Sequence, residues 1–274
     1  DPPGAKRFVP MLAAIADPAV AAAADWPLDD PSPRASYAPS YAERFVALEP
    51  QVARFRRGAG AVLVVGWALS EEDLPADSLG DPGAGASIAL FASEGPDRPF
   101  VEARGSGEPA RGSLSLAVPW ARAVVGVEAR VAGFVGRWRA GMELPAGATD
   151  LPALSDLLLL TSSDHLPATL DAAIPLARGS TVAASGERLG IFWEAYPPPD
   201  PTGPVTVTVV VRAREAEPGA LRWSEALPRQ TRVVPRAVAL ELPALPPGRY
   251  AVEVEMAWPG AAPRRARREL TIGY

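Results

Sequence analysis

Apolar and polar residues alternate along most of the chain from Gln51 onward, which predicts β-strands rather than helices. In the first half, after a looser start at Val52 and Phe55, the predicted strands cover 61–69, 87–92, 113–118, 121–131 and 137–144. In the second half they cover 156–161, 181–183, 189–196, 205–212, 232–242, 250–257 and 265–272. Turns rich in proline and glycine separate these strands. The pattern is typical of an all-β protein built from antiparallel β-sandwiches.

Residues 1–48 follow a different pattern. Phe8, Leu12 and Ile15 lie four and three residues apart, which predicts a short helix with one apolar side. The proline-rich stretch 25–39 predicts an extended strap, and a second brief helix is expected over 41–48. We interpret 1–48 as a partly helical, proline-rich arm that packs on the domains after it.

The two halves of the strand-rich region resemble each other. The stretch around Trp67 matches the stretch around Trp193, 126 residues later. Leu114-Ser115-Leu116 matches Leu240-Glu241-Leu242 at the same offset, and 139–144 matches 267–272 at an offset of 128. Nearly constant offsets indicate an internal repeat. We therefore predict two tandem sandwich domains, 49–150 and 151–274.

Two features of the second half resemble immunoglobulin-like and fibronectin type III-like sandwiches. Trp193 lies where these families place a core tryptophan, and Pro246-Pro247-Gly248-Arg249-Tyr250 resembles their tyrosine corner, whose tyrosine bonds to the backbone a few residues upstream. The resemblance covers about 151–274 and implies an immunoglobulin-like sandwich, with 49–150 as a degenerate copy. The families' cysteine pair is missing, so the resemblance implies a disulfide-free variant.

The chain also resembles uncharacterised secreted bacterial β-sandwich proteins with Pro-Gly-Arg-Tyr hairpins. That wider likeness implies a periplasmic, extracellular or cell-surface setting and carries over no catalytic residue. The chain begins at Asp1 rather than methionine, and removal of a secretory signal is the commonest reason for such a start, although trimming is equally compatible. We expect an exported protein.

Composition removes several classes of site. The chain has 274 residues and a formal net charge of -5, which argues against a general nucleic-acid binder. It contains no cysteine and one histidine, His165, so thiolate zinc sites, iron–sulfur clusters, cysteine nucleophiles and multi-histidine metal centres are excluded. No apolar run approaches the roughly 20 residues of a membrane-spanning helix. We expect no cofactor and no transmembrane segment.

Three clusters could carry chemistry, and each has a simpler interpretation. Ser162-Ser163-Asp164-His165 unites the residue types of a hydrolase triad, but adjacency does not create its geometry and no Gly-X-Ser-X-Gly elbow is present. The acidic stretch 71–81 could bind calcium, although a solvated loop is the favoured interpretation. Glu241, Glu253 and Glu255 could include a catalytic pair, but cross-strand pairing with arginines explains them. We assign no catalytic, metal or cofactor residue.

Seven tryptophans are present, and we place Trp67 and Trp193 in cores. Trp223 and Trp258 are the candidates for contact with a protein partner or a glycan, because exposed tryptophan stacks on sugars and forms interface hot spots. The sequence thus predicts a non-catalytic, exported interaction or structural protein, one component of a larger envelope or surface assembly. A carbohydrate-binding accessory module is the alternative, and an unrecognised hydrolase is a third reading.

Overall fold

The computed structural model describes residues 44–69, 86–95, 98–107, 111–131, 133–144, 151–163, 165–199, 203–213, 220–226, 232–242 and 244–273. The predicted arm lies outside these residues except for its last five positions, and the acidic stretch 71–81 lies wholly outside them. The described chain is nearly all β and its sheets are mainly antiparallel, as the alternation predicted.

A first pair of sheets is built from residues of the first half. One sheet has the strand order β1-β8-β7-β4-β5 and the other the order β2-β3-β6. Their bounds are β1 Arg44–Phe45, β2 Gln51–Arg57, β3 Gly60–Ala68, β4 Ala86–Ser93, β5 Phe100–Gly107, β6 Arg111–Val118, β7 Arg122–Val131 and β8 Phe134–Glu143. All neighbours are antiparallel except β1 and β8, which are parallel.

A second pair of sheets repeats this arrangement. One sheet has the order β10-β12-β15, with β9 also paired to β12, and the other has the order β11-β17-β16-β13-β14. Their bounds are β9 Ala153–Leu154, β10 Leu158–Leu160, β11 Val182–Ala183, β12 Arg188–Tyr196, β13 Val205–Ala213, β14 Ala220–Glu225, β15 Val234–Glu241, β16 Gly248–Ala257 and β17 Arg264–Ile272. A short edge strand again runs parallel to the last strand, β11 beside β17.

The matching strand orders support an internal repeat and correct one detail of its alignment. Leu63 pairs with Leu116 in the first pair of sheets, and Leu189 pairs with Leu240 in the second. Leu116, rather than Leu114, is therefore the counterpart of Leu240. The shift is two residues, which keeps the same side chains facing the core.

Each pair of sheets encloses a hydrophobic core. Trp67 lies in the first core and Trp193 in the second, both fully buried, which confirms their predicted places. The Tyr250 hydroxyl donates a hydrogen bond of 2.9 Å to the carbonyl oxygen of Pro246. This contact is the predicted tyrosine corner.

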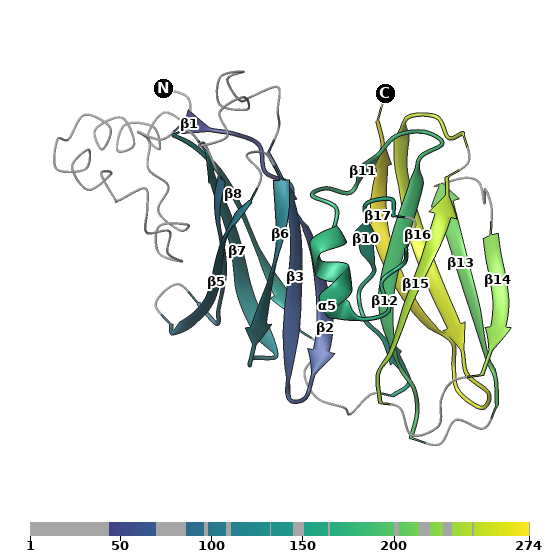
Figure 1. Ribbon diagram of the computed structural model, residues 1–274. Coiled ribbons are helices and arrows are strands. Elements are labelled where there is room, and N and C mark those ends of the chain that lie inside the picture. The colour runs from purple at the N-terminus through teal and green to yellow at the C-terminus, as the bar shows by residue number, and fades with distance from the viewer. Residues whose placement is uncertain are drawn as a thin grey trace, which may run out of the picture.

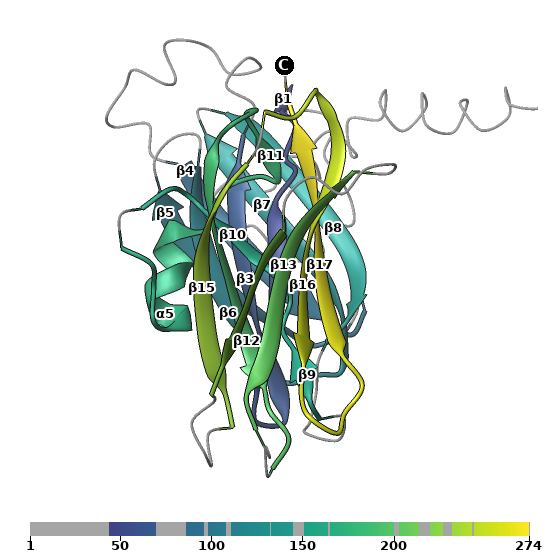
Figure 2. The same ribbon diagram turned by 90° about the vertical axis from the view of Figure 1, so that its right-hand side faces the viewer.

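The two sandwiches stack into four layers (Figure 1), and the three-stranded sheet of the first faces the β10-β12-β15 sheet of the second. Seen along the stack, the strands of successive layers overlie one another (Figure 2). A third apolar cluster fills the contact between the middle layers, and Phe55 and Phe192 meet there with ring centroids 6.0 Å apart. The short helix α5, Leu170–Ala173, adds Leu170 and Ala173 to it. We call this contact between the two middle sheets the seam.

Candidate functional site

The seam contains buried polar groups within its apolar surface, and Gln51 is the most enclosed of them. Its side-chain oxygen accepts a hydrogen bond from the backbone N–H of Leu159 at 2.6 Å, and its side-chain nitrogen donates to the carbonyl oxygens of Leu159 and Arg178. Gln51 is fully buried. Its amide therefore completes the hydrogen bonding along the edge of β10, where the backbone N–H of Arg178 also donates to the carbonyl oxygen of Leu159.

Arg54 and Asp156 form a second polar link across the seam. The guanidinium of Arg54 holds both carboxylate oxygens of Asp156, at 2.6 and 2.9 Å, and the backbone N–H of Arg54 donates to the same carboxylate. Hydrogen bonding to Asp156 raises the pKa of Arg54 above its ordinary value. A planar fork on a carboxylate fixes both distance and orientation.

Arg57, Glu194 and Tyr196 form the third link. Arg57 holds both oxygens of Glu194 at 2.6 and 2.7 Å, and the Tyr196 hydroxyl donates to the same carboxylate at 2.9 Å. The Glu194 side chain is only 3% exposed, so its charge requires these partners. Burial, followed by the nearby Glu194 charge, raises the pKa of Tyr196 and keeps its hydroxyl a donor.

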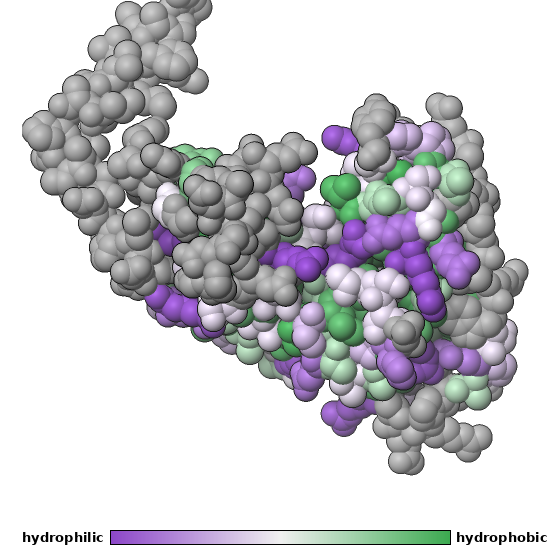
Figure 3. All heavy atoms as spheres, turned by 45° about the horizontal axis from the view of Figure 1, so that its top comes forward, coloured by the Kyte–Doolittle hydropathy of each residue, from purple (hydrophilic) through white to green (hydrophobic). Residues whose placement is uncertain are grey.

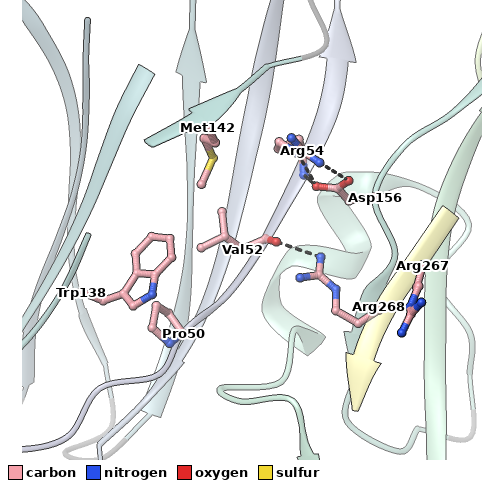
Figure 4. Close-up of a pocket in the computed structure, with 8 residues that line it drawn as sticks. All are labelled: Pro50, Val52, Arg54, Trp138, Met142, Asp156, Arg267 and Arg268. Atoms are coloured by element: carbon pink, nitrogen blue, oxygen red, sulfur yellow. Dashed lines mark hydrogen bonds and ion pairs between the residues drawn. The ribbon is translucent and has the colours of Figure 1, made fainter. Parts of the chain in front are cut away.

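A groove opens at the edge of the seam beside the Arg54 link. It has a volume of about 280 Å³ and is lined by Pro50, Val52, Arg54, Trp138, Met142, Asp156, Arg267 and Arg268. Figure 4 shows residues from both sandwiches meeting there. We call it the seam groove. In the tilted view of Figure 3 the surface is notched between the two sandwiches, and a band of hydrophilic residues runs from one sandwich to the other there.

Arg268 reaches from the second sandwich to the first within this groove. It lies two residues from both Ala266 and Leu270, which belong to the second core, so its side chain points inward from β17 as theirs do. Its guanidinium donates to the carbonyl oxygens of Leu157, at 2.9 Å, and Val52, at 2.8 Å, rather than to a carboxylate. Burial lowers its pKa. The groove thus holds an arginine charge that no carboxylate neutralises directly.

The groove is lined mainly by arginine, apolar and aromatic side chains. Its single carboxylate, Asp156, is already held by Arg54, so it is poorly placed to accept a proton from a substrate. Three arginines and one tryptophan instead offer donors, positive charge and an aromatic surface.

The Ser162–His165 cluster, which the sequence favours as a surface loop, shows no triad among the residues described. The Ser163 hydroxyl donates to the backbone carbonyl of His165 and accepts from its backbone N–H, so these bonds do not involve the imidazole ring. His165 is exposed in a loop, and Asp164 lies outside the described residues.

The predicted carboxylate pair is engaged by arginines. Glu253 is held by Arg212 at 2.8 Å, and Glu255 by Arg265 at 2.6 Å. Within the described part of the chain, no group of three or more His, Asp or Glu side chains could hold a metal ion. No helix among these residues is long and apolar enough to span a membrane.

Trp258 does not have the exposure expected of a contact residue. It is 3% exposed and belongs to the second core. The reason is the alternation of β16, in which Tyr250, Val252, Val254 and Met256 point inward and Trp258 continues the series. Its ring is therefore unavailable as a platform. Trp223 lies in β14, and its backbone pairs with Val207 of β13. Its side chain lies outside the described part of the structure.

Sequence reasoning missed the seam residues and the groove. The polar links come from Gln51, Arg54 and Arg57 on β2, a strand that begins with only a loose alternation. Their partners lie more than a hundred residues later, and no local motif marks such pairs. The local signal was that β2 carries polar residues at positions 51, 54, 56 and 57, a pattern that departs from strict alternation.

No family model and no curated protein matches the chain. Among solved structures, red sea bream transglutaminase is 11% identical, with a TM-score of 0.25 over 82% of this chain. The chain spans 31% of that protein's length. The chicken interferon gamma receptor alpha chain is 10% identical, with a TM-score of 0.24 over 84% of this chain and all of the receptor chain.

Proposed function

We propose that this chain is a non-catalytic interaction protein, in which two joined sandwiches present the seam groove to an anionic group of a protein partner. The observation that carries the proposal is the seam itself, where a buried amide and two forked arginine–carboxylate pairs join the sandwiches. A partner site formed by both sandwiches is thereby held in shape before binding, which lowers the entropic cost of association.

The charge of the groove favours an acidic side chain as the group that enters it. Arg54 is matched by Asp156, whereas Arg268 bonds only to carbonyl oxygens and Arg267 lies at the rim, 59% exposed. Arg267 lies on the opposite face of β17 and pairs with Glu269, so a carboxylate entering beside Arg268 would supply the countercharge that Arg268 lacks. Trp138 provides an aromatic wall beside it.

An acidic glycan is the second candidate, because the groove combines an aromatic ring with arginines. Trp138 is partly buried on the groove wall, and sugars bind by stacking on such rings. This version of the carbohydrate-binding alternative relies on Trp138, since Trp258 is buried. It predicts binding of uronic-acid-containing glycans and none of neutral ones.

An exported setting and membership of a larger envelope or surface assembly complete the proposal. Both follow from the resemblance to secreted bacterial β-sandwich proteins. A body without a recognisable catalytic group among its described residues fits such a structural role.

The test compares two exposed arginines on β17 in protein isolated gently from its native source. Arg267 lines the groove, while Arg265 lies two residues away and does not. Both are exposed and pair with glutamates, so Arg265→Glu makes the same change of charge on the same strand away from the groove. We expect a stoichiometric partner, found by native mass measurement, to be lost from Arg267→Glu and retained by Arg265→Glu. A lone monomer that also fails to bind acidic glycans on an array would refute the proposal, as would equal retention by both variants.

A further inference from the structure

One sheet of the first sandwich buries the middle of its outward face, although the sheet is an outer layer of the stack and Arg104 and Arg122 on that face are 40% and 82% exposed. In β4, Ile88 and Leu90 point into the first core, so Ala89 and Phe91 point outward. Ala89 and Phe91 are nevertheless 0% and 1% exposed. Val135 of β8, on the same outward face, is fully buried as well.

The same face also buries a charged group. Glu128 of β7 accepts hydrogen bonds from Arg130 at 2.8 Å and from Arg137 at 2.6 Å, and the three side chains are 0%, 8% and 12% exposed. Charges on an outward sheet face normally remain in water, because desolvating them is costly. Their enclosure indicates a face made to be covered.

The second sandwich contains an internal comparison. Its sheet β11-β17-β16-β13-β14 has the same strand order, and its outward face carries Thr208, Glu253, Arg265 and Glu269. Arg265 and Glu269 are each 68% exposed. The second face also buries Ala251 and Val210, at 2% and 9% exposed, but it carries no charged side chain buried as completely as Glu128 among its described residues. The complete burial of a charged group therefore distinguishes the first sandwich.

The place of residues 1–43 in the sequence, directly before β1, points to what covers the face. Figure 1 shows the sheet as the outermost layer, with no described helix or strand beyond it. The described chain begins at Arg44 in β1, which is an edge strand of this same sheet. Phe45, 50% exposed, lies at that edge, and Phe100, 46% exposed, lies at the opposite edge in β5 and packs edge-on against Phe91.

We propose that the outward face of the β1-β8-β7-β4-β5 sheet is the docking site for the chain's own residues 1–43. Five strands span about 20 Å, whereas 43 residues reach about 60 Å even as a helix, so length does not prevent the contact. Phe8, Leu12 and Ile15, which the sequence places at helical spacing, supply an apolar side that suits Ala89 and Phe91. This inference is independent of the seam groove.

The absence of cysteine from the whole sequence allows a direct test on the full-length chain. One spin label is placed at Ala14→Cys, and a second at Ser106→Cys or Ser224→Cys. Both serines are exposed, and both lie on an outer edge strand, β5 in the first sandwich and β14 in the second. We expect distances within about 30 Å, set by the width of the sheet, for the Ser106 pair only. A broad distribution for the Ser106 pair, or equal distances to both sites, would overturn the proposal.

Two further measurements decide which molecule supplies the cover and which face receives it. If the segment docks on its own chain, dilution with unlabelled protein leaves the short distance unchanged. If the short-distance signal instead weakens on dilution, the face is covered by a second copy of the chain and the proposal is overturned. Ala89→Glu places a charge on the face and is expected to abolish the short distance. Thr208→Glu, at the equivalent position of the second sandwich, is expected to leave it intact. If Ala89→Glu fails to fold, the two label pairs without this substitution still show whether residues 1–43 dock on the first sandwich.

Discussion

Replacing Gln51 by leucine tests whether the buried amide is needed to join the two sandwiches. Leucine has nearly the same size and keeps the apolar contacts of the position, but it cannot hydrogen-bond. The change leaves the backbone N–H of Leu159 without its partner, and Arg178 loses the hydrogen bond to its carbonyl oxygen. The carbonyl oxygen of Leu159 keeps its bond from the backbone N–H of Arg178.

The expected cost follows from this count. A buried donor without a partner costs about 1–3 kcal/mol, and a lost acceptor bond adds about 1 kcal/mol. We therefore expect Gln51→Leu to lower the free energy of unfolding by about 2–4 kcal/mol. With a urea m-value of about 2–3 kcal/mol/M, the midpoint falls by about 1 M.

Urea denaturation followed by tryptophan fluorescence measures this shift. Glu49→Leu is the matched control, because Glu49 is exposed two residues earlier and its replacement should change stability by less than about 0.5 kcal/mol. If Gln51→Leu unfolds within 0.5 kcal/mol of the unmutated protein, the amide is not a structural part of the seam and this reasoning fails.

Three further changes probe the seam and the second core by the same denaturation assay. Gly66→Ala should lower the free energy of unfolding by about 1–3 kcal/mol, because the added methyl group would clash with the carbonyl oxygen of Arg178 across the seam. Gly141→Ala is the control, since its methyl group meets open space, and equal stability of the two variants would contradict the close approach. Tyr196→Phe should lower stability at pH 8, and this difference should shrink above pH 10. Above pH 10 the Tyr196 hydroxyl loses its proton in the unfolded chain but keeps it in the folded protein, because its pKa there is raised. The free energy of unfolding of the unmutated protein therefore falls by up to about 1.4 kcal/mol per pH unit, and a difference between the two proteins that does not change with pH would refute this. Tyr250→Phe should cost about 1 kcal/mol by removing the corner hydrogen bond, and an unchanged midpoint would show that this bond contributes nothing.

Period-two alternation predicted most strands because most of them are amphipathic. The strands that were missed are β1, β5, β9 and β14, and β1 lies within the segment 41–48 for which a brief helix was expected, so that prediction was wrong. All four are edge strands, and an edge strand has only one paired neighbour and a weaker apolar pattern. The 100–107 segment, for example, contains two glycines and two charged residues among its eight. The same alternation, followed two residues beyond Met256, places Trp258 in the core.

The seam left a trace in the sequence that alternation alone does not explain. Residues 157–160 are four consecutive leucines, whose side chains point alternately into the second core and into the seam cluster. In β3, Leu63 and Val65 face the first core while Val64 faces the seam. Strands covered on both faces are expected to be continuously apolar. Such runs could have predicted middle layers, but not which layer each one would meet.

The polar links settle how the two middle layers are placed relative to each other. Apolar sheet faces attract without much preference for position, because the hydrophobic effect is not directional. Gln51, Arg54 and Arg57 lie at intervals of three along β2, about 20 Å from first to last, and each holds a different partner in the second sandwich. Three directed contacts along one strand prevent both sliding and rotation. The seam groove, which residues of both sandwiches line, therefore keeps a fixed shape, as the proposed binding of a partner there requires.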